Sequence, residues 1–342
     1  MAQDTLRAAV IGCGVGAAHG YAYAHAPEYA LAAICDLQED ALARFYERSG
    51  VARGTVREYR DYRQMLEREQ LDVVSVATPD DYHANPVCAA ADAGVRGILC
   101  EKPIASSLRD ADRMIETVER NGTRMSVDHS RSWWPSFQAV RRAIQAGEIG
   151  GLTRVVVHMG GRRAMLFRNG THMVDAMAYF ADSRPEWVIA AHERGFEDYG
   201  TEYHGQGGKD PMLDPATTLI VEFANGVRGI LNAAKGTVAI YELDLIGPSG
   251  RYWLTQTGGA AWKAETPEGE PREAPVPWTE PPPADLGPNL VPAVLELAHM
   301  VRDGAASSSP PQRARDTLEI LLAALLSQSR GSAKVVLPLP RT

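Results

Sequence analysis

Strand-like and helical segments alternate through the first 129 residues of the chain. The strand-like segments are short and almost continuously apolar, as expected for parallel strands that are covered on both faces. Helical segments separate them, and this alternation predicts an α/β domain with a doubly wound parallel sheet. The expected strands are 6–11, 30–35, 72–77, 97–100 and 124–128, and the expected helices include 40–48, 61–69, 84–93 and 108–121.

A glycine-rich turn, Gly12-Cys13-Gly14-Val15-Gly16, follows the first expected strand. Ala17 takes the third position of the G-x-G-x-x-G/A pattern. Glycine lets backbone N–H groups approach a pyrophosphate at a helix N-terminus, where the helix dipole favours negative charge. A glycine cluster alone is weak evidence, but between a strand and a helix it predicts a dinucleotide-binding site.

Asp36 ends the second expected strand, close to the spacing of the acid that binds the adenosine ribose. A carboxylate there accepts hydrogen bonds from the ribose hydroxyls and repels a 2′-phosphate. Residues 37–40 contain no arginine that would neutralise such a phosphate. We therefore expect NAD rather than NADP as the cofactor. The alternative interpretation is that Asp36 caps the next helix, and one residue can do both.

The strand at 97–100 stops at the turn Glu101-Lys102-Pro103. Open α/β sheets bind their ligands outside the carboxyl ends of the strands, where Lys102 is expected. Proline fixes the local φ, so the ammonium group is aimed by rigid backbone. The alternative is a surface turn with an ordinary solvated lysine.

The pattern changes after His129, which suggests a first domain at 1–129 and a second at 130–342. A helix at 135–146 and a strand at 152–159 precede segments with the period of two that marks strands. These strands, expected at 188–191, 217–223, 227–232, 238–246 and 251–254, predict an antiparallel meander with one face on helices. The other face is expected to meet solvent or a second subunit. Helices at 290–301 and 312–329 and a strand at 334–337 close the chain, and 265–283 is expected as a surface loop.

His172 and Asp175 are three residues apart at the start of an expected helix, with Thr171 as its N-cap. Both side chains then lie on one face of the first turn. A helix N-terminus lowers the pKa of histidine, which suits His172 to act as a base near neutrality. A long polar loop at 195–214 carries Tyr203 and His204, and loops of that length are usually functional or mobile.

Composition excludes several classes of protein. The net charge of −8 argues against a nucleic-acid binder, and no apolar run is long enough for a membrane span. No basic and apolar leader precedes Leu6, so we expect no signal peptide and a cytoplasmic location. The four cysteines, Cys13, Cys35, Cys88 and Cys100, lack metal-type spacing and are expected to be reduced. No metal is expected.

Taken together, these motifs resemble the oxidoreductases grouped around glucose–fructose oxidoreductase and inositol dehydrogenase (Gfo/Idh/MocA). The resemblance covers nearly the whole chain and also includes Glu222-Phe223-x-Asn225-Gly226 and Gly247-x-x-Gly250. It implies a Rossmann domain and a second α/β domain whose large open, mostly antiparallel sheet forms a homodimer or homotetramer. It further implies NAD-dependent, reversible oxidation of a secondary alcohol on a sugar, sugar acid or cyclitol. Beside the glycine turn and Asp36, the cofactor residues that it implies are Thr78, Pro79, His83, Glu101 and Lys102.

The resemblance also implies that Lys102 and His172 flank the reacting hydroxyl. Four residues before the histidine, many members of the family carry aspartate, whereas this chain has Arg168, followed by Asn169. We expect Arg168 to bind an acidic group of the substrate, or else to turn outward. Three further arginines, Arg131, Arg162 and Arg163, also lie at or just beyond the ends of elements that are expected to face the nicotinamide. The expected substrate-binding residues are Arg131, Arg168, Asn169, Asp175, Tyr203 and His204.

Two other functions use the same motifs. An NAD-dependent glycosidase or lyase oxidises its sugar transiently and needs the same first step. A cofactor-bound sensor without turnover needs neither Lys102 nor His172, and both are present. The dehydrogenase is therefore the preferred interpretation, while the sugar and the carbon oxidised cannot be read from the sequence.

Overall fold

The computed structural model describes residues 5–205, 210–263, 276–277 and 289–340. These residues form two compact units. The first contains the described residues of 1–130 and 288–315, and the second contains those of 131–287 and 316–341. Residues 289–315 thus group with the first unit although the sequence analysis placed them in the second domain. The functional division into a cofactor-binding and a substrate-binding domain stays a prediction.

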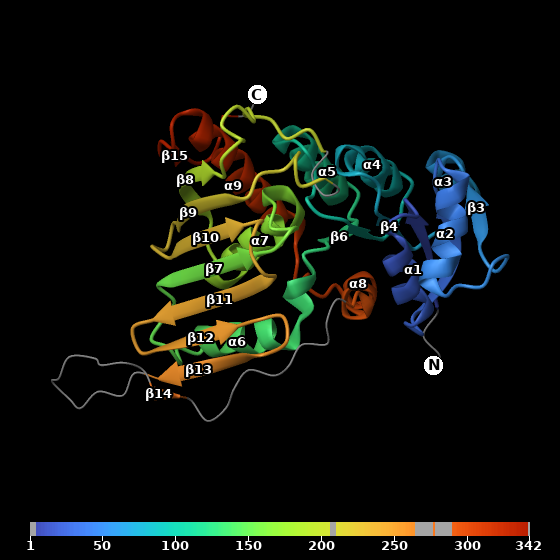
Figure 1. Ribbon diagram of the computed structural model, residues 1–342. Helices are drawn as coiled ribbons and strands as arrows, with labels where there is room; N and C mark the ends of the chain where they lie inside the picture. Colours follow the sequence, from blue (N-terminus) through green and yellow to red (C-terminus); the bar gives the residue numbers. More distant parts are fainter. Residues whose placement is uncertain (1–4, 206–209, 264–275, 278–288, 341–342) are drawn as a thin grey trace. The chain divides into compact units, whose positions relative to one another are not determined.

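The first unit is built on a six-stranded parallel sheet in the order β3-β2-β1-β4-β5-β6 (Figure 1). This confirms the doubly wound sheet predicted from the alternating pattern. The order reverses between β1 and β4, and ligands of such sheets bind at this point outside the carboxyl ends of the strands. The strands are β1 (Leu6–Ile11), β2 (Tyr29–Cys35), β3 (Arg57–Tyr59), β4 (Val73–Val76), β5 (Gly97–Cys100) and β6 (Arg124–Val127).

Helices join these strands, and polar side chains cap the starts of α3 and α5. The carboxylate of Asp61 accepts the backbone N–H of Arg63 before α3, and the hydroxyl of Ser107 accepts that of Asp110 before α5. Helix α8 packs against β5 and β6. The helices are α1 (Ala17–Ala24), α2 (Glu39–Ser49), α3 (Tyr62–Arg68), the short η1 (Asp80–Tyr82), α4 (Ala84–Asp92), α5 (Leu108–Arg120) and α8 (Val291–Asp303).

The second unit is built on a nine-stranded sheet in the order β14-β13-β12-β11-β7-β10-β9-β8-β15. The sheet is mostly antiparallel, as predicted, but the expected meander is wrong at its centre. Strand β7, with Val155 and Val157 fully buried, lies between β10 and β11 and runs parallel to β10. The strands are β7 (Arg154–Gly160), β8 (Pro185–His192), β9 (Thr217–Phe223), β10 (Arg228–Ala234), β11 (Ile240–Gly247), β12 (Gly250–Leu254), β13 (Gly259–Lys263), β14 (Val276–Pro277) and β15 (Val335–Val336).

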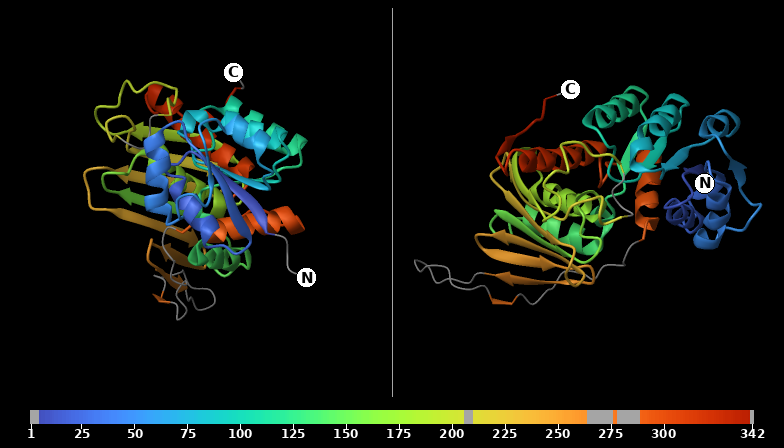
Figure 2. Two further views of the ribbon diagram at one scale, coloured as in Figure 1. Left: turned by 90° about the vertical axis from the view of Figure 1, so that its right-hand side faces the viewer. Right: turned by 45° about the horizontal axis from the view of Figure 1, so that its top comes forward.

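The helices of the second unit lie on one face of this sheet (Figure 2). Alternate strand residues such as Leu219, Leu231 and Leu243 are buried, whereas their neighbours Ile220 and Ile230 are partly exposed. This is the period of two that the sequence shows. The helical segments are α6 (Pro135–Gln145), η3 (Leu166–Gly170), α7 (Thr171–Ala181) and most of α9 (Pro311–Ser329), while η2 (Ser130–Trp133) begins at the boundary of the two units.

Two further expectations concern the surface. The proline- and acid-rich stretch 265–283 lies outside the described residues, except for Val276–Pro277, which pairs with β13. Among the described residues, no helix combines the length and apolar character needed to cross a membrane.

Ser327 of α9 forms hydrogen bonds with β8 of the second sheet and with the segment that precedes β15. Its buried hydroxyl accepts the backbone N–H of Ala190 at 2.9 Å and donates to the carbonyl of Ala333 at 2.7 Å. Ser327→Ala should lower the free energy of unfolding by about 1–3 kcal/mol, because it leaves a buried N–H unsatisfied. Urea denaturation measures this change. Ser329→Ala, which removes an exposed hydroxyl bonded to Leu326, is the control, and equal losses in the two variants would contradict the assignment.

Candidate active site

The glycine turn has the shape that a pyrophosphate needs. Gly12 has φ +91°, and a Cβ added to it would lie 2.4 Å from the carbonyl oxygen of Ala77. A Cβ added to Gly14 would meet no atom within 4 Å, so the turn is tight on one side and open on the other. Gly16 is the N-cap of α1, which directs that helix N-terminus toward the turn. A tight turn with open space on one side and a helix N-terminus beside it fits the pyrophosphate of a dinucleotide.

Asp36 lies at the end of β2 and contacts the glycine turn directly. One carboxylate oxygen accepts the backbone N–H of Cys13 at 2.7 Å, and the other accepts that of Gln38 at 2.8 Å. The N-cap of α2 is Gln38, so the alternative interpretation of Asp36 as the cap is wrong. Helix α2 begins at Glu39, three residues after Asp36, and Asp36 instead holds the turn next to the expected ribose site.

Sequence reasoning missed Arg60, which the pairing of β2 with β3 places near Asp36. Cys35 lies opposite Tyr59, and the backbone N–H of Asp36 donates to the Tyr59 carbonyl at 3.1 Å. The guanidinium of Arg60 donates to the carbonyl of Leu37. Residues 37–40, which follow β2, do not contain this cation, because Arg60 follows β3. The signal would have been a basic residue directly after the third strand.

His83 connects the turns that follow β4 and β5. It is fully buried, and its ring nitrogens lie 2.9 Å from the carbonyl oxygen of Thr78 and 3.0 Å from that of Pro103. Pro79 is exposed beside it, and Lys102 is half-buried. We therefore assign His83 to positioning these turns rather than to direct contact with a cofactor. The resulting edge carries Gly12, Thr78 and Lys102 on neighbouring strands.

A chain of buried hydrogen bonds lies under this edge. The two ring nitrogens of His19 lie 3.0 Å from the Ser75 hydroxyl and 3.3 Å from a carboxylate oxygen of Glu101. The Tyr23 and Ser75 hydroxyls are 2.8 Å apart. The other Glu101 oxygen accepts the backbone N–H of Lys102 at 3.2 Å. These contacts link α1 and β4 to the turn that carries the lysine.

Burial raises the pKa of Glu101, but the hydrogen bond and charge of His19 outweigh it and lower the pKa to about 2. Glu101 therefore stays ionised in the buried chain. The ligand atoms of His19, Glu101 and Asp128 all lie within 4.8 Å of one another, which is a spacing that a metal ion could use. The expectation of no metal stays a prediction. Burial raises the pKa of the Cys13 and Cys100 thiols, which fits their expected role as small apolar side chains.

In the second unit, the residues around His172 form one continuous helical segment. Thr171 was expected as the N-cap, but it has helical backbone angles, and the π-helical turn η3 precedes it without a break. The expected cap is therefore wrong, and His172 lies beyond the first turn rather than at a helix N-terminus. The start of η3 is held by the buried Asp214, whose carboxylate accepts the backbone N–H groups of Phe167 at 3.1 Å and Arg168 at 3.0 Å.

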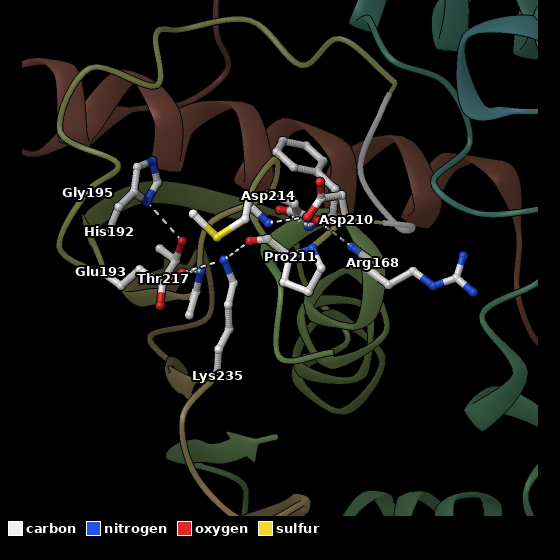
Figure 3. A network of polar contacts seen from close by, with 12 residues as sticks. Arg168, His192, Glu193, Gly195, Asp210, Pro211, Asp214, Thr217 and Lys235 are labelled. Carbon is white, nitrogen blue, oxygen red and sulfur yellow. Dashed lines mark hydrogen bonds and ion pairs between the residues drawn. The ribbon is translucent and has the colours of Figure 1, made fainter. Parts of the chain in front are cut away.

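Figure 3 shows that the side chain of Arg168 extends away from Asp214, although its backbone N–H points toward it. Arg168 and His172 are four residues apart, so they share a face of the helical segment. His172 is half-buried, and Asp175 on the following turn is 2% exposed. The structure thus brings Arg168, His172 and Asp175 to one helix face.

The remaining expected substrate residues do not all lie together: Asn169 and Arg131 lie near Tyr241, whereas Tyr203 and His204 lie elsewhere. The Asn169 side chain donates to the Tyr241 hydroxyl at 2.7 Å, and the Arg131 guanidinium lies 5.9 Å from the Tyr241 ring centre. Tyr203 is buried and stacks on Phe167 at 3.7 Å. His204 is exposed and lines a different hollow of about 350 Å³ together with residues 195–199, Met212 and Leu213. Tyr241 was not found from the sequence, because only the pairing of β11 with β7 brings it here.

A protein-family model matches most of the residues that form the first unit. Residues 6–129 match the family described as "Oxidoreductase family, NAD-binding Rossmann fold" (GFO_IDH_MocA). Over these residues the chain is similar to the Gfo/Idh/MocA family of oxidoreductases. This confirms the resemblance stated from the motifs, and the Rossmann sheet confirms the predicted fold.

Two curated proteins illustrate the range of relatives that the chain is similar to. The chain is 39% identical to D-apiose dehydrogenase of Paraburkholderia graminis over 145 residues, which are 42% of this chain but only 37% of that protein. It is 26% identical to myo-inositol 2-dehydrogenase of Thermotoga maritima over 263 residues, covering 72% of this chain and 74% of that protein. The chain thus spans little more than a third of the first relative and about three quarters of the second.

A solved structure shows the same fold over nearly the full length. It is an oxidoreductase from Agrobacterium radiobacter in complex with NAD⁺, L-tartaric acid and magnesium, with a TM-score of 0.74 and 21% identity. The match covers 97% of this chain and 98% of that one.

The low pKa of Glu101 gives a testable dependence on pH. Because the pKa is lower in the folded than in the unfolded chain, ionised Glu101 stabilises the fold above its ordinary pKa of 4.5. This contribution is lost as the pH falls from about 4.5 toward about 2. Glu101→Gln should therefore lose less stability than the wild type across that interval.

The measurement is urea denaturation at steps of pH, with Glu116→Gln as a control on α5. Parallel stability curves for the wild type and Glu101→Gln would contradict the assigned pKa.

Proposed function

We propose that the chain is an NAD(H)-dependent dehydrogenase that reversibly oxidises a secondary alcohol of a sugar, sugar derivative or cyclitol. The observation that carries this proposal is the carboxyl edge of the first sheet. There the glycine turn, Asp36 and Lys102 follow β1, β2 and β5. Relatives named as a sugar dehydrogenase and a cyclitol dehydrogenase support the substrate class.

The proposed chemistry divides between the cofactor and the chain. A bound nicotinamide supplies the hydride acceptor. Lys102, aimed by the turn that Glu101 and His83 hold, hydrogen-bonds the substrate oxygen and stabilises the alkoxide that develops. Neutral His172 accepts the hydroxyl proton. The choice of His172 as the base rests on the resemblance of its motif to that of the Gfo/Idh/MocA oxidoreductases, since it does not lie at a helix N-terminus.

NAD is the proposed cofactor, because the carboxylate of Asp36 lies where the adenosine ribose is expected and would repel a 2′-phosphate. Cys13 and Gln38 fix the orientation of that carboxylate. Arg60 nearby supplies a positive charge that would attract the same phosphate. We therefore propose a preference for NAD that is smaller than Asp36 alone would give.

We also propose a homodimer or homotetramer that forms through the second sheet, in the cytoplasm. Helices lie on one face of the sheet, while residues such as Ile220 and Ile230 are partly exposed on the other. A sheet face that no helix covers and that carries such apolar residues is suited to pair with a second copy. Analytical ultracentrifugation of the full chain tests this assembly.

Lys102→Ala and His172→Ala should each reduce turnover about 100- to 10,000-fold, the usual range for acid–base groups. Binding of NADH should stay nearly unchanged, because neither residue holds the adenosine half. Steady-state kinetics and NADH fluorescence titration measure the two effects. His158→Ala, which removes an exposed histidine of β7, is the control. A variant that keeps more than about a tenth of the wild-type rate would show that the residue has been misassigned.

Asp36→Ala should narrow the preference for NADH over NADPH, because it removes the charge that repels the 2′-phosphate. Asp36→Ala combined with Arg60→Ala should lose the NADPH affinity gained, because the compensating cation is gone. Dissociation constants for both cofactors measure this, with Glu39→Ala as the control for an exposed acid on α2. Tighter binding of NADPH than NADH by the wild type would contradict the proposed cofactor.

A further inference from the structure

Lys235 directly follows β10, and its ammonium group contacts the loop at 193–216, which joins β8 to β9 (Figure 3). The ammonium nitrogen lies 2.5 Å from a carboxylate oxygen of Glu193 and donates a hydrogen bond to the backbone carbonyl of Pro211. It also lies 4.3 Å from the centre of the Phe196 ring. Because the side chain is only 13% exposed, these contacts replace most of the stabilisation that water gives an exposed ammonium group.

These contacts attach Lys235 to both arms of the loop. Glu193 directly follows β8, and its carboxylate also accepts the backbone N–H of Ala216 at 2.9 Å. The backbone N–H of Glu193 donates to the carbonyl of Ala216, again at 2.9 Å. Glu193 and Ala216 thus close the loop just beyond the last residue pair of β8 and β9. Since Pro211 belongs to the returning arm, one cation joins that arm to the point where the loop leaves the sheet.

The returning arm of the loop also caps the start of η3. The first N–H groups of a helical segment have no partner within the segment. The N-cap residue Met165 supplies no side-chain hydrogen bond. Two residues of the loop accept these N–H groups instead: the Pro215 carbonyl accepts that of Leu166 at 2.8 Å, and the Asp214 carboxylate accepts those of Phe167 at 3.1 Å and Arg168 at 3.0 Å.

A ring contact joins the loop to the same segment. Tyr203 stacks on the fully buried Phe167 with the ring centres 3.7 Å apart. Helical backbone continues from η3 into α7 without a break, and His172 is the second residue of α7. A shift of the loop at 211–215 therefore shifts the start of the segment that carries His172.

We propose that Lys235 is a positioning residue for the proposed reaction. Its ammonium group holds residues 211–215 against the start of η3, and η3 fixes where His172 lies. A neutral side chain of the same length could still pack on Phe196, but it could not bind the Glu193 carboxylate and the Pro211 carbonyl. This proposal rests on the proposed function, since it concerns the base of that reaction. Small misplacements of a reacting group lower the rate strongly.

Amide hydrogen exchange tests the link between Lys235 and η3 without any substrate. Lys235→Met removes the charge and keeps the length of the side chain, whereas Lys235→Arg keeps the charge. Lys334→Met is the matched control, because Lys334 is an exposed lysine that also lies over an aromatic ring, 4.4 Å from the centre of Trp187. Mass spectrometry of the peptide that spans residues 165–170 follows the exchange.

In Lys235→Met, the amides of residues 166–168 should exchange about 10- to 100-fold faster, the effect of losing one charge-assisted hydrogen bond. The amides of residues 174–180, which bond within α7, should change by less than about 2-fold. Lys235→Arg should recover part of the protection. Unchanged exchange at residues 166–168, or an equal increase in Lys334→Met, would overturn the proposal.

Steady-state kinetics tests the consequence for the reaction. Lys235→Met should lower kcat about 10-fold or more for a sugar that the wild type oxidises, and Lys235→Arg should recover part of it. In a His172→Ala background, Lys235→Met should change kcat by less than about 2-fold, because the group that it positions is gone. A wild-type kcat in Lys235→Met, or the same fold-loss with and without His172, contradicts the positioning role.

The two measurements separate this proposal from the proposed function. Turnover by the wild type, with exchange and kcat that do not depend on Lys235, overturns the positioning role and leaves the dehydrogenase standing. Exchange that depends on Lys235, without NAD reduction by any sugar, supports the link to η3 and contradicts the dehydrogenase. Thermal unfolding identifies a variant that has lost its fold. Glu193→Gln, which weakens the ion pair and leaves the Pro211 contact, should then show the same changes at a smaller size, and their absence would overturn the proposal.

Discussion

The two hydrogen bonds of the His19 ring hold together the part of the first unit on which the proposed chemistry depends. One reaches Ser75 in β4, and the other reaches Glu101 directly after β5. Glu101 in turn accepts the backbone N–H of Lys102. Since His19 lies in α1, the helix that follows the glycine turn, the cofactor turn and the lysine are parts of one rigid network. A buried polar network of this kind gives a single arrangement only when its members are satisfied together.

Most of the first unit could be predicted from the sequence, because each βα segment is local and its apolar strands are distinct. The glycine turn, Asp36 and Lys102 all follow strands whose ends meet at one edge of a parallel sheet. Features that depend on strand pairing could not be predicted in the same way. Arg60 lies near Asp36 only because β3 pairs with β2, and 24 residues separate the two in the sequence. The proposed preference for NAD therefore takes account of a cation that the sequence near Asp36 does not reveal.

The fold of the second unit was less predictable, because it depends on pairing between strands that are distant in the sequence. The strand period gave a mostly antiparallel sheet, but the insertion of β7 between β10 and β11 is a non-local pairing. It is this pairing that places Tyr241 beside Asn169. Thr171 matched the residue preference of an N-cap, yet Asp214, 43 residues further along the chain, anchors an earlier start at η3. A tertiary contact thus overrode a local preference and left His172 inside the helical segment.

The central claim is that hydride passes from a sugar carbon to the nicotinamide, and isotope transfer tests it most directly. The wild-type protein is incubated with NAD and a sugar deuterated at its ring carbons, and the reduced cofactor is analysed by mass spectrometry. The account predicts that NADH accumulates with a deuterium on its nicotinamide while the sugar becomes a ketone. Cleavage or elimination of the sugar without accumulation of deuterated NADH, or no reaction with any aldose, glycoside, uronate or cyclitol that is tried, would contradict it.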